Sequence, residues 1–173
     1  MVSKLQVIIA LLFGVVGVLY QVTVDTTTWA AKQQGSLFTS PDMLQRFITN
    51  PDQVQKWFPM VSQFKSADSR PFGVGKKYQA IYDLPILGEY VMLLSVVEYK
   101  INHIITLESN SFLRPTFTIN MVEKAPNNTI LTFSMEYKRS SALFQWTLGP
   151  LLQFLTRQQM QRSLFQLRLI FPI

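Results

Sequence analysis

The stretch that decides the fold is TFTINMVEKAPNNTILTFSMEYK, Thr116–Lys138. Apolar and polar residues alternate on both sides of its centre, which predicts two strands that each bury one face and expose the other. The apolar set is Phe117, Ile119 and Met121, followed by Leu131, Phe133, Met135 and Tyr137. Ala125-Pro-Asn-Asn128 supplies turn residues between them. Because this connection is too short for a crossover helix, the two strands must run antiparallel.

The same reasoning extends the sheet toward the N-terminus. β-branched and aromatic residues recur in short runs separated by turn residues, as expected for an antiparallel meander. The runs are Lys76 to Tyr82, Tyr90 to Tyr99 and His103 to Asn110, with Val61 to Ser66 as a further strand and Ala30 to Phe38 as a weaker one.

Helical patterns occur at both ends of this region. Ser40-Pro41 and Asn50-Pro51 resemble helix starts, with a capping side chain followed by proline at the first helical position, and Pro59 should end the second helix. A long helix should follow Gly149-Pro150, with an apolar stripe of Leu151, Leu152, Leu155, Met160, Leu164 and Leu167. We expect an α+β fold in which a curved antiparallel sheet wraps around this C-terminal helix. The space between them is either filled by large side chains or used as a cavity.

The N-terminal segment from Leu5 to Val24 contains twenty residues and no charge. As a helix it would extend about 30 Å, the thickness of a bilayer core. We interpret residues 1–27 as a membrane anchor, and residues 28–173 as one domain. A cleaved signal peptide is the main alternative, although Gln21 to Thr28 offers no A-x-A cleavage pattern. A buried core helix is the third.

The charges beside this segment predict an orientation. Lys4 precedes it and Asp25 follows it, which favours a cytoplasmic N-terminus and a lumenal or extracellular domain. The sequon that begins at Asn127 agrees with that side of the membrane. After signal cleavage the same domain would be secreted instead.

Composition excludes several classes of site. The 173 residues are 48% hydrophobic and only 15% charged, with no cysteine and one histidine. Thiolate chemistry is therefore excluded, and neither a metal cage nor a cofactor is expected. The net charge of +6 is spread along the chain without a nucleic-acid motif, so a membrane surface is a better partner than nucleic acid.

The order of these elements resembles the START-like, helix-grip superfamily (SRPBCC type), which includes the polyketide cyclase/dehydrase and coenzyme Q-binding groups. The resemblance covers residues from about Ala30 to Leu169. The resemblance implies a cavity for a lipid or another apolar molecule between the sheet and the long helix. The leading apolar segment departs from the minimal family pattern and makes a soluble cytosolic cyclase less expected. The stretches that carry the resemblance are Ser40 to Phe47, Asn50-Pro-Asp with Trp57-Phe-Pro59, Gly73 to Tyr78, Asn128 to Phe133, and Gly149 to Leu152 through Leu167.

The candidate ligand-binding residues are those that strand alternation or helical spacing directs toward that cavity. Aromatic side chains with a polar tip suit a site that holds an apolar molecule and orients one polar group. The set is Tyr78, Tyr82, Tyr99, His103, Phe117, Met121, Phe133, Met135, Tyr137, Leu152 and Leu155.

Three functions remain open at this point. The first is binding of a hydrophobic small molecule by a membrane-tethered carrier or sensor. The second is a cyclase or dehydratase that uses His103 as general base together with Tyr99, although spacing identifies no acid–base partner for the histidine. The third is an interaction scaffold whose core is filled by the same side chains.

Overall fold

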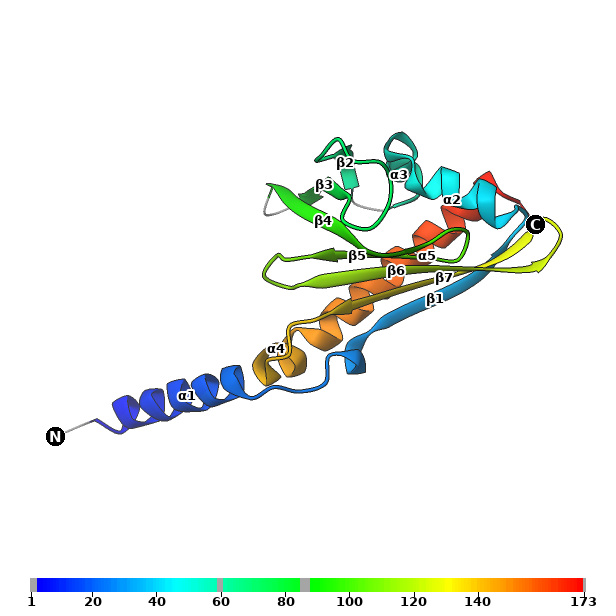
Figure 1. The fold of residues 1–173 in the computed structure, drawn as a ribbon. Helices are drawn as coiled ribbons and strands as arrows, with labels where there is room; N and C mark the ends of the chain where they lie inside the picture. Colours follow the sequence, from blue (N-terminus) through cyan, green and yellow to red (C-terminus); the bar gives the residue numbers. More distant parts are fainter. Residues whose placement is uncertain (1–2, 59–60, 85–87, 173) are drawn as a thin grey trace.

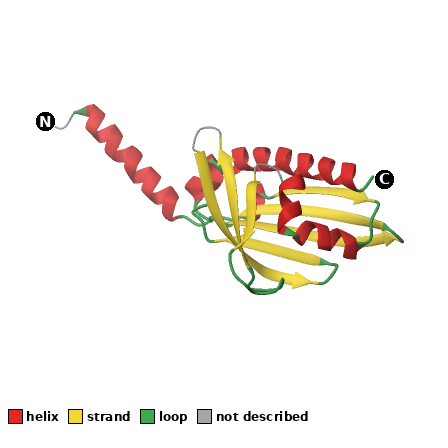
Figure 2. Cartoon of the chain, turned by 90° about the horizontal axis from the view of Figure 1, so that it is seen from above, coloured by secondary structure: helices red, strands yellow, loops and turns green. Residues whose placement is uncertain are grey.

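The computed structural model describes residues 3–58, 61–84 and 88–172. Pro59, which should end the second helix, lies outside these ranges. The described chain forms one curled antiparallel sheet with helices packed against it and one helix that projects away (Figures 1 and 2). The fold is therefore α+β, as the sequence predicts. In chain order the elements are α1 Lys4–Gln21, the 3-10 helix η1 Thr27–Trp29, β1 Ala31–Leu37, α2 Pro41–Thr49, α3 Pro51–Trp57, β2 Val61–Ser66, β3 Lys77–Leu84, β4 Gly88–Lys100, β5 Ile104–Ser109, β6 Pro115–Ala125, β7 Asn128–Tyr137, α4 Ala142–Thr147 and α5 Gly149–Ile170.

The sheet has the strand order β1-β7-β6-β5-β4-β3-β2. Strands β2 to β7 form the expected meander, and β1 returns to pair with the last strand, β7. The β6–β7 register places Phe117 opposite Met135 and Ile119 opposite Phe133. The apolar face predicted from alternation is therefore continuous across this pair, and it forms the centre of the core.

Helix α5 lies along the concave face of the sheet, chiefly against β1 (Figure 1). Gly35 of β1 permits this close approach, because a Cβ at this position would lie 2.7 Å from a methyl group of Leu164. Helices α2 and α3 cover the other end of the same face. Ser40 and Asn50 cap them, since the Ser40 hydroxyl accepts from the Met43 amide and the Asn50 side chain from that of Asp52.

The predicted stripe on the C-terminal helix is only half correct. Met160, Leu164 and Leu167 are buried, but Leu151 and Leu155 are exposed and Leu152 is half-buried. The buried face instead includes two small polar residues, Thr156 and Ser163, which share the helical face of Met160 and Leu167. Choosing positions by hydrophobicity alone therefore rotated the predicted face away from the true one. The short helix α4 was not predicted.

Helix α1 stands apart from the domain, and none of its described residues is buried. It is the one described helix with the length and apolar composition to cross a membrane. Its C-terminal end is fixed to the domain by backbone hydrogen bonds. The amide of Val24 donates to the Ser140 carbonyl, and the amide of Ala142 donates to the Val22 carbonyl, each over 2.7 Å.

Candidate functional site

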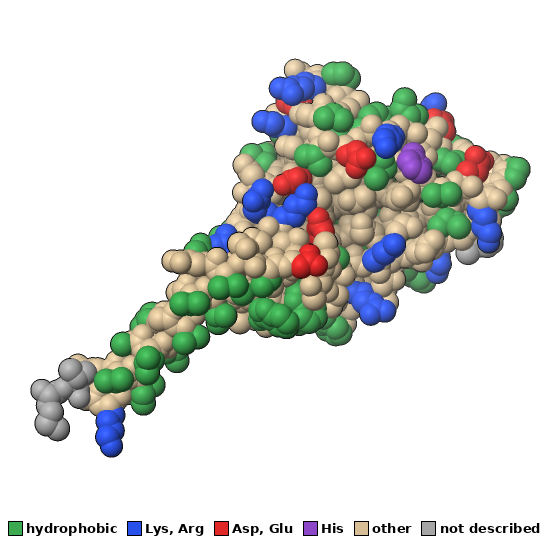
Figure 3. Space-filling view, turned by 60° about the horizontal axis from the view of Figure 1, so that its bottom comes forward, with side chains coloured by type: hydrophobic (Ala, Val, Ile, Leu, Met, Phe, Trp, Pro, Cys, Tyr) green, Lys and Arg blue, Asp and Glu red, His purple; other side chains and the backbone are tan. Residues whose placement is uncertain are grey.

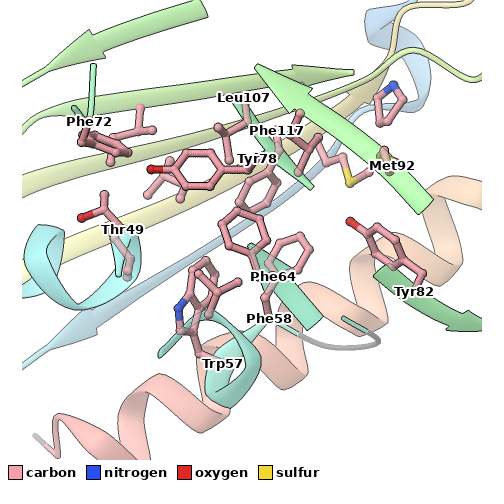
Figure 4. Close-up of a pocket in the computed structure, with 17 residues that line it drawn as sticks. Thr49, Trp57, Phe58, Phe64, Phe72, Tyr78, Tyr82, Met92, Leu107 and Phe117 are labelled. Carbon is pink, nitrogen blue, oxygen red and sulfur yellow. The ribbon is translucent and has the colours of Figure 1, made fainter. Parts of the chain in front are cut away.

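An apolar pocket lies between α2–α3 and the concave face of the sheet (Figure 4). Every element that contributes to it does so with uncharged side chains. Aromatic rings from helix α3, from the strands and from the β2–β3 loop crowd into it. The lining is Ile48, Thr49, Val54, Trp57, Phe58, Phe64, Phe72, Tyr78, Tyr82, Met92, Leu94, Ile105, Leu107, Pro115, Phe117, Ile119 and Met135.

The free space in this pocket is about 50 Å³. A dry cavity of about 150 Å³ accommodates one benzene molecule, and pockets that bind drug-sized ligands have volumes of about 300 Å³ or more. The pocket thus has room for a few water molecules, and its own side chains occupy most of the volume that a ligand would need.

A second void lies on the α5 side of three of these residues. It measures about 20 Å³ and is lined by Phe58, Phe117 and Met135 together with residues of α5. These three side chains belong to both linings and so form a partition between the two spaces. Phe58 and Met135 are only half-buried, which leaves them freer to change rotamer than the fully packed core.

Trp57 forms one wall of the pocket. Its ring stacks on Phe133, with centroids 5.6 Å apart and planes inclined by 7°, and it meets Phe58 edge-on. Its Nε1 is buried and has no hydrogen-bond partner among the described residues. A buried donor without a partner is costly, so this N–H is a candidate contact for an acceptor on a bound molecule.

Two tyrosine hydroxyls supply further polar groups. In Figure 4 the Tyr78 hydroxyl lies on the side of Thr49 and Phe72, and Tyr82 lies on the opposite side beside Met92. Burial and the nearby Asp68 carboxylate raise the pKa of Tyr78 to about 12, and burial also raises the pKa of Tyr82. Both phenols therefore stay protonated at neutral pH and are available as hydrogen-bond donors.

Four of the residues expected at a ligand site line this pocket: Tyr78, Tyr82, Phe117 and Met135. Two more, Met121 and Phe133, are fully buried in the core outside the lining. Tyr137 hydrogen-bonds Thr156 of α5 over 2.9 Å, and burial raises its pKa. Leu152 is half-buried, and Leu155 is 43% exposed because it lies off the buried face of α5.

The two residues considered for catalysis are not brought together in the pocket. His103 is exposed, in the turn between β4 and β5 that follows the left-handed Asn102, and Figure 3 shows it on the surface. Its strand parity predicts an inward side chain, but the strand begins one residue later. Tyr99 packs edge-on against Phe72, and its hydroxyl accepts a hydrogen bond from the Gln45 amide over 2.9 Å.

Sequence reasoning missed most of the wall contributed by α3, β2 and the β2–β3 loop. Val61 and Phe64 are both buried although they are three residues apart, because a bulge between Val61 and Gln63 changes the alternation. Phe72 lies in a loop, where no periodicity marks an inward residue. Trp57 and Phe58 were visible as apolar residues at a helix end, and that was the available signal.

Comparison with known proteins supports the fold alone. No family model matches the chain, and no curated protein matches it by sequence. Solved structures do match. TTHA0849 from Thermus thermophilus has a TM-score of 0.63 at 13% identity and covers 80% of this chain and 93% of its own. CV1439 from Chromobacterium violaceum has a TM-score of 0.63 at 16% identity, and the match covers 83% of this chain and 98% of CV1439. NE0264 from Nitrosomonas europaea has a TM-score of 0.63 at 14% identity, and the match covers 82% of this chain and 92% of NE0264.

These matches and the observed topology define the class. The domain has a helix-grip architecture, in which a curled antiparallel sheet closes on a long C-terminal helix. At such low identity the likeness concerns the fold and does not extend to a ligand or an activity.

Proposed function

We propose that this protein is a membrane-tethered carrier or sensor that binds a lipid or another hydrophobic small molecule. The bound molecule would occupy the pocket between α2–α3 and the sheet. The observation that carries the proposal is the chemistry of the pocket lining, which is apolar and aromatic with a few polar groups. Such a lining suits an apolar body with one polar group that must be oriented.

Binding would require the partition to move. If Phe58 and Met135 change rotamer, the pocket joins the void beside α5, and further side chains of the lining must move aside before a slender chain fits. The unpaired Nε1 of Trp57 and the phenols of Tyr78 and Tyr82 are the donors that would meet a carbonyl or hydroxyl of the ligand. This arrangement favours a narrow molecule, such as an acyl or isoprenoid chain, over a bulky rigid one.

The tether in this proposal is α1. A helix of 18 residues extends about 27 Å, close to the hydrocarbon thickness of a bilayer, and every described residue of α1 faces outward. Burying so much apolar surface in lipid is strongly favourable. The flanking charges Lys4 and Asp25 support a cytoplasmic N-terminus and a domain on the opposite side. Asn127 of the sequon is exposed on the β6–β7 turn, at the end of the domain away from α1.

The test is ligand recovery with a matched pair of variants. Protein purified in detergent is extracted with organic solvent for mass spectrometry, and binding of a fluorescent fatty acid is measured in parallel. Met92→Trp should fill the pocket and reduce binding at least tenfold. Leu93→Trp is the control, because Leu93 is the next residue of β4 and is 53% exposed.

Equal binding by the two variants would place the probe outside the pocket. An empty extract together with no probe binding by the unmodified protein would contradict the proposal and would favour a scaffold with a filled core. The cyclase alternative receives no support from the pocket, because its described lining includes no carboxylate, imidazole or amine for general acid–base catalysis.

A further inference from the structure

A cluster of exposed apolar side chains lies on the domain where α1 meets it. We call Trp146, Leu148, Leu151, Phe154 and Leu155 the exit surface. Their exposed fractions range from 43% for Leu155 to 67% for Trp146. Figure 3 shows apolar side chains gathered on the part of the domain beside α1. An exposed apolar patch of this kind marks a surface that contacts something apolar.

The surrounding sequence is unusual for a solvated helix pair. From Ser140 to Thr156 the chain has no charged residue, although this segment includes all of α4 and the first two turns of α5. Charges resume on either side, at Arg139 and at Arg157. The uncharged segment is thus bounded at both ends by arginine.

The position of the exit surface relative to α1 is fixed. The two backbone hydrogen bonds at Val22 and Val24 form a β-bridge between Thr23 and Ser141, which is the residue before α4. Trp29 then packs over Gly149 and meets Trp146 edge-on at 6.4 Å. Short, paired connections of this kind hold α4 directly beside the end of α1.

We infer that the exit surface rests in the headgroup layer of the bilayer that α1 crosses, so that the domain is seated on the membrane and does not hang from a free linker. The inference deepens the proposed function and rests on its tether. The headgroup layer adds roughly 5–8 Å to each side of the hydrocarbon core. Leu148 to Leu155 spans about 10 Å of helix, slightly more than the thickness of that layer, so the exit surface is long enough to reach across it.

Two further features match an interface with lipid. Tryptophan and phenylalanine of an amphipathic segment insert at the headgroup boundary, and cations beside them attract anionic lipids. Arg114, Lys138 and Arg139 lie next to Tyr20 at the end of α1 and line a shallow hollow there. Glu108 approaches Arg114 and Lys138 at 3.8 and 3.6 Å, so among the described residues Arg139 is the cation of the three with no ion pair to a carboxylate.

A depth measurement tests the inference on the full chain. Because the protein has no cysteine, single cysteines introduced by substitution label cleanly. Spin labels at Phe154→Cys and Phe165→Cys are compared in nanodiscs of equal parts phosphatidylcholine and phosphatidylserine. The two phenylalanines are 58% and 62% exposed, lie on the same face of α5, and are separated by about 16 Å along the helix. A third label at Val15→Cys reports on α1 itself.

The expected result is oxygen accessibility typical of lipid at Val15, an interfacial value at Phe154, and a solvent value at Phe165, with the Phe154 value several-fold closer to lipid than the Phe165 value. Solvent values at both positions of α5, with Val15 in lipid, would overturn the inference and leave the tether intact. A solvent value at Val15 would overturn the tether and the inference with it. Dipolar broadening at Phe154 that grows with protein concentration would assign the exit surface to a second copy, which also overturns it.

Discussion

The guanidinium of Arg139 donates a hydrogen bond to the Tyr20 hydroxyl over 2.7 Å and lies 5.3 Å from the centre of its ring. The same guanidinium lies 4.0 Å from the Phe112 ring centre. Arg139 thereby joins the last turn of α1 to the β5–β6 loop. It is the side-chain complement of the backbone hydrogen bonds that connect α1 to α4.

Arg139→Ala should loosen α1 relative to the domain without unfolding it. Exposed pairs of this kind contribute less than about 1 kcal/mol, so the unfolding free energy of the domain should change little. Hydrogen exchange at the Val24 amide, which donates to Ser140, should become several-fold faster. Lys138→Ala is the control and should leave that amide unchanged. Equal exchange in both variants would show that the backbone bonds alone fix α1.

Gly35→Ala should destabilise the domain by about 1–3 kcal/mol, because the added methyl group would overlap the buried side chain of Leu164. Denaturant unfolding measures the change. Gly73→Ala is the control, since a Cβ at Gly73 meets no atom within 4 Å. Combining Gly35→Ala with Leu164→Ala should cost less than the sum of the two single changes, because the second removes the overlap. Strict additivity would refute the close-approach explanation.

The sequence predicted the sheet better than the site because the two depend on different signals. Alternation from Phe117 to Tyr137 specifies strands, faces and pairing direction, and the structure matches each. The pocket depends on a bulge between Val61 and Gln63 and on a loop phenylalanine, Phe72. Neither feature produces a periodic pattern in the sequence. His103 shows the opposite error, since alternation predicts an inward side chain but the strand begins only at Ile104, and His103 lies exposed in the preceding turn.

The C-terminal helix shows a further limit. Thr156 and Ser163 occupy the buried face because small residues let α5 approach the sheet and because Thr156 bonds Tyr137. A hydrophobicity pattern assigns such residues to the surface. It also assigned Leu151 and Leu155 to the core, although the structure exposes them beside α1.

Tyr78 should make stability fall at alkaline pH. Its pKa is near 10 in the unfolded chain and is raised to about 12 in the fold by burial. Its contribution is therefore complete below pH 10 and is lost as pH rises through 12, because the unfolded chain releases the proton first. The loss is on the order of 2 kcal/mol. Tyr78→Phe should flatten this part of the profile, measured by denaturant unfolding between pH 9 and pH 12 (roughly the span of the two pKa values). An unchanged slope would contradict the buried phenol.

Met135→Ala should open the partition between the two voids. Met135 lines both, and removing a methionine side chain from such a position costs about 2 kcal/mol or somewhat more, through lost burial and the space left behind. The enlarged space is apolar and should accept xenon or benzene, which would restore part of the lost unfolding free energy by binding the native state. Leu169→Ala is the control, because Leu169 is 68% exposed on α5 and lines neither void. Pressurised xenon followed by xenon-129 NMR measures the occupancy. If xenon binds both variants equally, the two voids do not communicate through Met135, and a ligand would have to fit beside it.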